Sequence, residues 1–164
     1  MVAACTPECL DLKNSIPRAG FYEYEGDPNK TISLPSITIY GIDAPGDSAL
    51  MRNSSAKLIY LPLRLNVNEC KYVIHYSYDG YNDDAHNDTL ELSYTPLPQF
   101  ISHECGALYF FKIDKVSHTT HLLRAEEHRD TVTNVDIEYL KLFFYDPTTT
   151  ETDTETGTEA GTDA

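Results

Sequence analysis

Apolar and polar residues alternate with a period of two along much of the chain. In the segment 89–95, Leu90, Leu92 and Tyr94 share one face of an extended strand, and polar residues fill the other face. Turn-forming residues separate such segments, for example Asp79-Gly80 and the Pro-Leu-Pro run at 96–98. The pattern predicts about eight strands, which we place at 21–25, 36–40, 57–61, 71–78, 89–95, 107–115, 119–124 and 137–145.

The predicted fold class is all-β, a single antiparallel β-sandwich of about seven to nine strands. Only the segment 125–130 has a pattern compatible with one helical turn. The chain has 164 residues, which corresponds to one domain of about 150 residues. We expect an N-terminal lead over 1–19, a sandwich domain over 20–146 and a disordered acidic tail over 147–164, because the tail is rich in Thr and has no aromatic residue.

The alternating pattern also predicts which side chains form the core. The expected core residues are Ile37, Ile39, Val73, Leu90, Leu92, Tyr94, Tyr109, Phe111, Ile113, Leu140, Leu142 and Phe144. The other face of the segment 71–78 carries Tyr72, Ile74, Tyr76 and Tyr78. That face is either one side of the core, which we favour, or an aromatic platform for a carbohydrate.

Charge and motifs narrow the classes of function. The chain has 26 acidic and 12 basic residues and a net charge of −14, which disfavours binding to nucleic acid or to an anionic membrane. No apolar run approaches the about 18 residues of a membrane-spanning helix, so a soluble body is expected. The sequence lacks a G-x-S-x-G elbow, a phosphate-binding glycine loop and an H-E-x-x-H motif, and we therefore assign no catalytic residue.

One loop is a candidate metal site. The segment 79–88 contains the carboxylates Asp79, Asp83, Asp84 and Asp88 between two predicted strands. Calcium prefers six to eight oxygen ligands, and these side chains could supply several of them. The loop lacks the residue order of an EF-hand, so a solvated hairpin loop is the favoured interpretation and a calcium site the alternative.

The N-terminus carries a candidate lipidation site. Cys5 follows Val2, Ala3 and Ala4, which fits the small-residue pattern before a lipidated cysteine. A signal peptide needs a charged region and about 7 to 15 apolar residues ahead of that site, but only four residues precede Cys5. We therefore expect an upstream segment that the present sequence does not include. The other cysteines are Cys9, Cys70 and Cys105, and no pair has the C-x-x-C spacing of a zinc or thioredoxin-like site.

Several segments resemble an uncharacterised domain family of Bacteroidota envelope lipoproteins. They are Gly20 to Tyr24, Ser36 to Ile42, Leu61 to Leu63, Ile101 to Gly106, Val116 to His121, Val132 to Asn134 and Tyr139 to Phe144, of which the Glu-Cys-Gly block at 104–106 is the most specific. The resemblance implies an exported β-domain with a lipid on Cys5 and supplies no activity. It also favours a location in the cell envelope over the alternative, the cytoplasm.

In an oxidising envelope, lipidation of Cys5 would leave three cysteines and room for one disulfide. We expect Cys9 to pair with Cys105, with Cys70 to Cys105 as the alternative. The expected function is a non-catalytic binding or structural role with no cofactor, and the expected partners are a glycan or an envelope protein. The alternatives are a small secreted hydrolase that uses carboxylates near 79–88 and a calcium-dependent recognition module.

Overall fold

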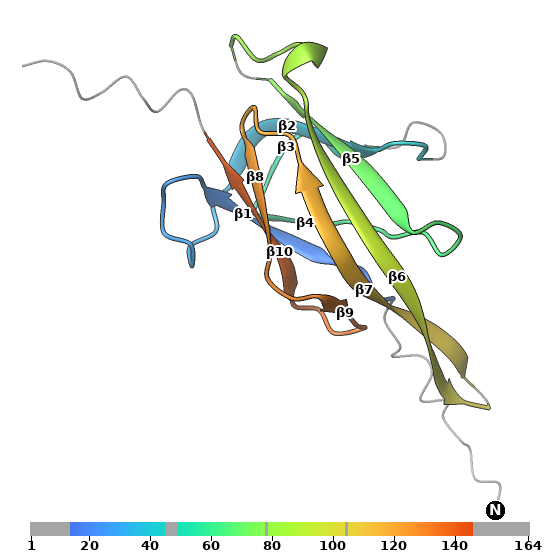
Figure 1. Cartoon of the computed structure of the whole chain (residues 1–164). Helices are drawn as coiled ribbons and strands as arrows, with labels where there is room; N and C mark the ends of the chain where they lie inside the picture. The colour runs from blue at the N-terminus through green and yellow to red at the C-terminus, as the bar shows by residue number, and fades with distance from the viewer. Residues whose placement is uncertain (1–13, 45–48, 78, 104, 146–164) are drawn as a thin grey trace, which may run out of the picture.

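The computed structural model describes residues 14–44, 49–77, 79–103 and 105–145, and this part of the chain folds into two packed β-sheets (Figure 1). The predicted all-β class is confirmed. The strands are β1 Arg18–Glu23, β2 Leu34–Gly41, β3 Ala49–Ala56, β4 Leu58–Tyr60, β5 Glu69–Tyr76, β6 Asp88–Ser102, β7 Gly106–His118, β8 Leu123–Glu127, β9 Thr131–Val132 and β10 Glu138–Phe144, and the 3-10 turn η3 spans Asp84–His86. The predicted acidic tail and most of the N-terminal lead lie outside the described residues.

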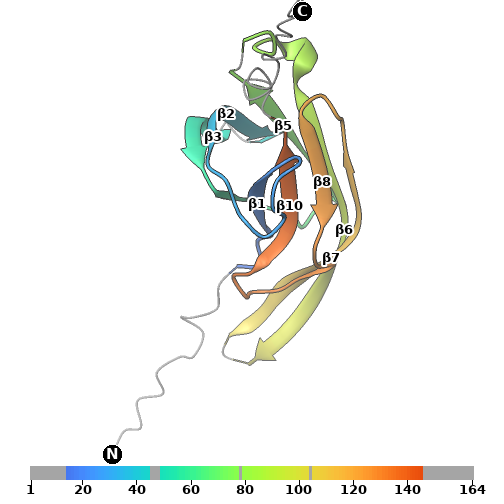
Figure 2. The ribbon, with the colours of Figure 1, turned by 90° about the vertical axis from the view of Figure 1, so that its left-hand side faces the viewer.

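The two sheets differ in size. The smaller has the order β4-β1-β10-β8 and the larger the order β3-β2-β5-β6-β7-β9, and Figure 2 shows the two layers from the side. All neighbouring strands are antiparallel except β1 and β10, which run parallel. The predicted antiparallel sandwich thus has one parallel pair of strands among those that the structure describes. Parallel neighbours need a long connection between them, and here the rest of the domain provides it.

Alternation along the strands builds the core between the sheets. On β5, Tyr72, Ile74 and Tyr76 are buried at 3%, 0% and 0% exposure, which confirms this face as core. The prediction that Val73 is a core residue was wrong, because Val73 lies on the opposite, outer face of the same strand. The remaining predicted core residues are buried as expected except Tyr109; they are Ile37, Ile39, Leu90, Leu92, Tyr94, Phe111, Ile113, Leu140, Leu142 and Phe144.

The β6–β7 hairpin runs well past the body of the sandwich (Figures 1 and 2). Strand β5 pairs with β6 only as far as Ser93, and β9 pairs with β7 only at Phe111 and Lys112. We call the part beyond these contacts, residues 96–102 and 106–110, the arm. Tyr109 lies on the arm and is 40% exposed, so its assignment to the core was wrong.

Two local predictions also fail for identifiable reasons. The predicted strand at 119–124 is a loop as far as Leu122, and β8 begins at Leu123, because backbone groups of this loop bind a buried carboxylate described below. The helical turn expected at 125–130 is instead the end of β8. The helical turn that does form is η3, where the Asp83 side chain caps the N-terminus by accepting a hydrogen bond from the His86 amide.

Within the described ranges, no helix has the length and hydrophobicity needed to cross a membrane.

Candidate functional site

The structure does not bring the four predicted calcium ligands together. Asp79, Asp83 and Asp84 are exposed in the loop that follows β5, whereas Asp88 is fully buried at the start of β6. Among the residues that the structure describes, no three His, Cys, Asp or Glu side chains are grouped so that they could hold a metal ion. The four carboxylates of the calcium alternative are therefore not grouped into one site.

Asp88 is instead the centre of a buried hydrogen-bond network. Its carboxylate accepts bonds from the Tyr76 hydroxyl at 2.8 Å and from the Thr119 hydroxyl at 2.6 Å. It also accepts bonds from the backbone amides of His121 and Leu122, at 2.8 and 2.7 Å. The four donors satisfy the hydrogen-bonding capacity of the buried Asp88 carboxylate, so its role is structural. Its hydrogen bonds fix the loop that connects the larger sheet to the smaller one.

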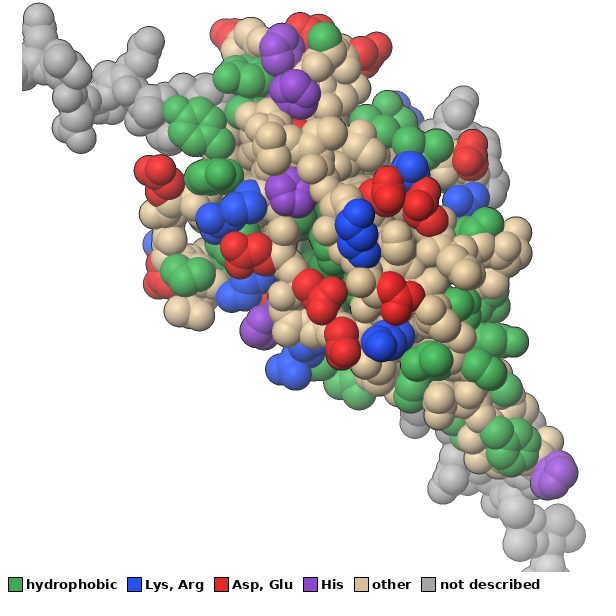
Figure 3. Space-filling model, in the orientation of Figure 1, with side chains coloured by type: hydrophobic (Ala, Val, Ile, Leu, Met, Phe, Trp, Pro, Cys, Tyr) green, Lys and Arg blue, Asp and Glu red, His purple; other side chains and the backbone are tan. Residues whose placement is uncertain are grey.

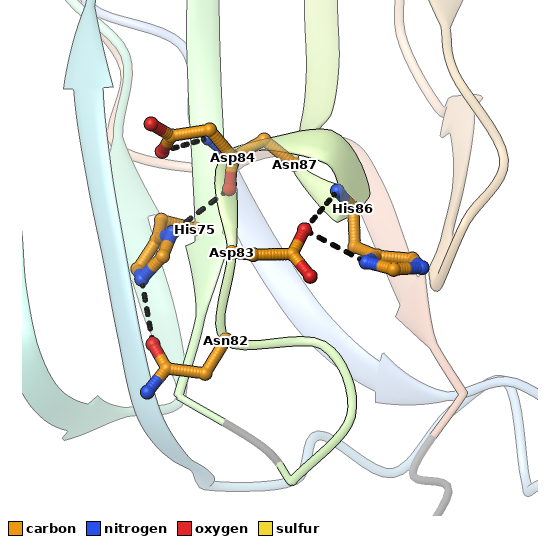
Figure 4. A network of polar contacts seen from close by, with 6 residues as sticks. All are labelled: His75, Asn82, Asp83, Asp84, His86 and Asn87. Atoms are coloured by element: carbon orange, nitrogen blue, oxygen red, sulfur yellow. Dashed lines mark hydrogen bonds and ion pairs between the residues drawn. The ribbon is translucent and has the colours of Figure 1, made fainter.

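A second polar network surrounds the η3 turn (Figure 4). The His75 ring on β5 lies between two carboxamides, with Nδ1 at 2.8 Å from Asn87 Oδ1 and Nε2 at 3.1 Å from Asn82 Oδ1. Each ring nitrogen therefore has a hydrogen-bond partner, and which atom donates depends on the His75 tautomer and on the orientation of each carboxamide. The network holds His75 in one orientation on the outer face of the sheet.

The same turn contains an exposed carboxylate–imidazole pair. The Asp83 carboxylate contacts His86 Nδ1 at 2.8 Å, and this hydrogen bond lowers the pKa of Asp83. Asp84 accepts a bond of 3.2 Å from the Asn87 side chain. These contacts give Asp83 and Asp84 hydrogen-bond partners within the loop.

A groove of about 710 Å³ lies next to this network, on the outer face of the larger sheet. We call it the outer-face groove. Thr38 on β2 is the register partner of His75 on β5, and Arg52 on β3 lies on the other side of β2. The groove is lined by Thr38, Tyr40, Gly41, Ile42, Asp43, Ala44, Ala49, Arg52, His75 and Asp84.

The groove combines hydrogen-bond donors and acceptors with little net charge. Arg52 and the Tyr40 hydroxyl can donate, whereas the carboxylates of Asp43 and Asp84 accept. Within the described part of the chain, Arg52 makes no hydrogen bond or ion pair, so its guanidinium is available to a ligand. The arrangement suits a polar ligand that both donates and accepts hydrogen bonds.

Cys70 occupies a different, buried position. It is a free thiol whose Sγ lies 3.2 Å from the Tyr94 hydroxyl, and burial raises the pKa of Tyr94. The alternative pairing of Cys70 with Cys105 is therefore not formed, and Cys105 is not among the free thiols of the described residues. Cys5 and Cys9 lie outside those residues, so the lipid on Cys5 and the Cys9 to Cys105 bridge stay predictions.

Residues 36–144 match a family of unknown function, DUF6452. The chain belongs to this family. The matched span runs from the third residue of β2 to the end of β10 and contains every residue that lines the outer-face groove, whereas β1 precedes it. No curated protein and no solved structure shows significant similarity to this DUF6452 chain.

Sequence reasoning did not identify the groove. The sequence pattern that could have indicated the groove is the set of outward-facing residues on β2, where Thr38 and Tyr40 flank the buried Ile39. Arg52 was missed with its whole strand, because β3 has one buried residue, Met51, and apart from the exposed Leu50 only polar or small side chains. An edge strand of this kind has too little hydrophobic pattern to be recognised.

Proposed function

We propose that this DUF6452 chain is a non-catalytic, exported domain of the Bacteroidota cell envelope that is lipid-anchored at Cys5 and binds an uncharged oligosaccharide in the outer-face groove. The groove is the observation that carries the binding role. The Val-Ala-Ala-Cys pattern and the resemblance to envelope lipoproteins support the anchor. A Cys9 to Cys105 bridge belongs to the same proposal, because the envelope permits disulfides.

The chemistry of the groove favours a sugar over a charged ligand. Sugar hydroxyls donate and accept hydrogen bonds at once, which matches a wall that carries Arg52 and two carboxylates. The ring of Tyr40 offers an apolar face of the kind that packs against a sugar ring. An anionic ligand would meet a chain of net charge −14, and a strongly cationic ligand would meet the Arg52 guanidinium.

Binding to an array of bacterial envelope oligosaccharides, followed by titration of each hit by NMR, tests the proposal. We expect shifts confined to the residues that line the groove and their neighbours, and at least a tenfold loss of affinity in Arg52→Ala. Arg129→Ala is the matched control, because Arg129 is an exposed arginine outside the groove. If no oligosaccharide binds, or if Arg52→Ala and Arg129→Ala lose the same amount of affinity, the groove is not the binding site and the proposed binding role fails.

A hydrolase is the second candidate, because Asp43 and Asp84 line the same groove. Glycosidases use two carboxylates, one as an acid and one as a base or nucleophile. The bound oligosaccharide should be recovered intact after prolonged incubation with the protein. Shortened products that disappear in Asp84→Asn, with binding retained, would replace the binding role with a catalytic one.

A further inference from the structure

The arm ends in an exposed apolar tip. Phe100 is 68% exposed, more than any other large hydrophobic residue in the part of the chain that the structure describes, and Ile101 beside it is 40% exposed. Both lie at the end of β6, directly before the turn into β7. Side chains of this size are normally covered, so their joint exposure at the end of a projecting hairpin marks a contact surface.

The arm also differs from the rest of the chain in charge. Between residues 95 and 111 the sequence has no Lys, Arg or Asp and a single Glu, at position 104, although the chain as a whole has 26 acidic residues. In Figure 3 the arm carries hydrophobic and uncharged side chains and one histidine, whereas the body beside it carries mixed acidic and basic side chains. An uncharged tip on an acidic body suits a partner that presents an apolar surface.

The described chain starts beside this arm. Asn14, Ser15 and Ile16 share a groove of about 520 Å³ with Leu108 and Tyr109 of β7. The N-terminal residues, which include Cys5, therefore join the domain on the side of the arm. The η3 turn and the outer-face groove beside it lie toward the opposite end of the molecule (Figures 1 and 2).

The number of residues between Cys5 and the first described residue limits the distance between the proposed lipid and the arm. At no more than about 3.6 Å per residue, the nine residues from Cys5 to Asn14 span at most about 32 Å. If Cys9 is bonded to Cys105, the spacer from Cys5 to the arm shortens to four residues and at most about 14 Å. A lipid on Cys5 would thus hold the arm close to the bilayer surface.

We propose that Phe100 and Ile101 insert into the interfacial layer of the membrane that holds the Cys5 lipid, as a second membrane contact. The inference rests on the proposed lipid anchor. Aromatic and aliphatic side chains are favourable at this depth, and one acyl chain alone gives only marginal binding, so a second contact strengthens the attachment. The outer edge of β6 carries Pro96 and Pro98, which lack N–H donors and disfavour addition of a partner strand there.

The chain contains no tryptophan, so a single Trp can report the environment of the tip. The test uses the full-length lipidated protein in phosphatidylcholine vesicles with brominated acyl chains. Phe100→Trp is compared with Tyr81→Trp, which is in the loop before η3 at the other end of the molecule. We expect the vesicles to shift the emission of Trp at position 100 to the blue and to quench it at least twofold, and to leave the emission of Trp at position 81 unchanged.

Three results would overturn the inference, and each has a different meaning. If mass spectrometry finds the lipid on Cys5 but Trp at position 100 emits as in water, the tip does not insert and the proposed anchor stands. If the emission is blue-shifted without vesicles and depends on protein concentration, a second copy of the chain covers the tip. If Cys5 carries no lipid, the proposed anchor fails and the inference fails with it.

Discussion

The Tyr76 hydroxyl donates a 2.8 Å hydrogen bond to the fully buried carboxylate of Asp88. The two residues lie on neighbouring strands, and the same carboxylate binds the loop that leads to the other sheet through Thr119 and the amides of His121 and Leu122. One acidic residue of the candidate calcium loop therefore holds the two layers of the sandwich together. Its role in stability is the first consequence to test.

Asp88→Ala should lower the free energy of unfolding by about 3–5 kcal/mol, because it leaves several buried donors without an acceptor. Urea unfolding followed by circular dichroism measures the loss. Asp79→Ala is the matched control, since Asp79 is exposed and its replacement should change stability by no more than about 0.5 kcal/mol. Equal, small effects of the two substitutions would contradict the structural role of Asp88.

Tyr22 should make the domain sensitive to alkaline pH. Burial and a hydrogen bond to Glu138, at 2.8 Å, raise the pKa of Tyr22 to about 12. In the unfolded chain a tyrosine titrates near pH 10, so the stabilisation is complete below about pH 10 and is lost as the pH rises towards 12. Between these values the unfolded state binds fewer protons than the native state, and stability falls by up to about 1.4 kcal/mol per pH unit.

Tyr22→Phe removes this titrating group and should flatten the decline in stability between about pH 10 and 12. The measurement is the free energy of unfolding at a series of alkaline pH values in the parent chain and the variant. Tyr72 and Tyr94, whose pKa values burial also raises, stay in both proteins, so part of the slope remains. Parallel curves for the two proteins would contradict the assignment.

Millimolar calcium should leave the melting temperature unchanged. The loop carboxylates already have local partners, with Asp83 on His86 and Asp84 on Asn87, and Asp88 is buried in its own network. A site occupied at a hundred times its Kd would add about 2.7 kcal/mol of stability, which a thermal melt detects. A calcium-dependent rise that Asp83→Asn abolishes would restore the calcium module as an explanation.

Local alternation predicted the class and most of the core. The pattern of Leu90, Leu92 and Tyr94 is sufficient to place β6 and its buried face, because one side of the strand packs on the core and the other does not. The arm could not be predicted in this way. Pro96 and Pro98 indicated a break, but β6 continues through them. Beyond Ser93, no described strand pairs with β6 on the β5 side, so no hydrogen bond there requires the N–H groups that these prolines lack.

The outer-face groove depends on information that local sequence does not contain. Thr38, Arg52 and His75 become neighbours only through the register of three strands, of which β5 is separated from β2 and β3 by another strand in the chain. In the same way, the acidic loop indicated a cation site because sequence shows the carboxylates but not their partners. Burial of Asp88 and capping of η3 by Asp83 are properties of the folded chain.

The most direct test of the proposed envelope anchor is mass spectrometry of the unreduced N-terminal and cysteine-containing peptides. The protein should be produced in a Bacteroidota host from a gene that includes its natural upstream region. The account predicts a lipid on Cys5, a bridge between Cys9 and Cys105, and a free thiol at Cys70. An unmodified Cys5 that follows an intact Met1, with a free thiol at Cys9, would contradict it.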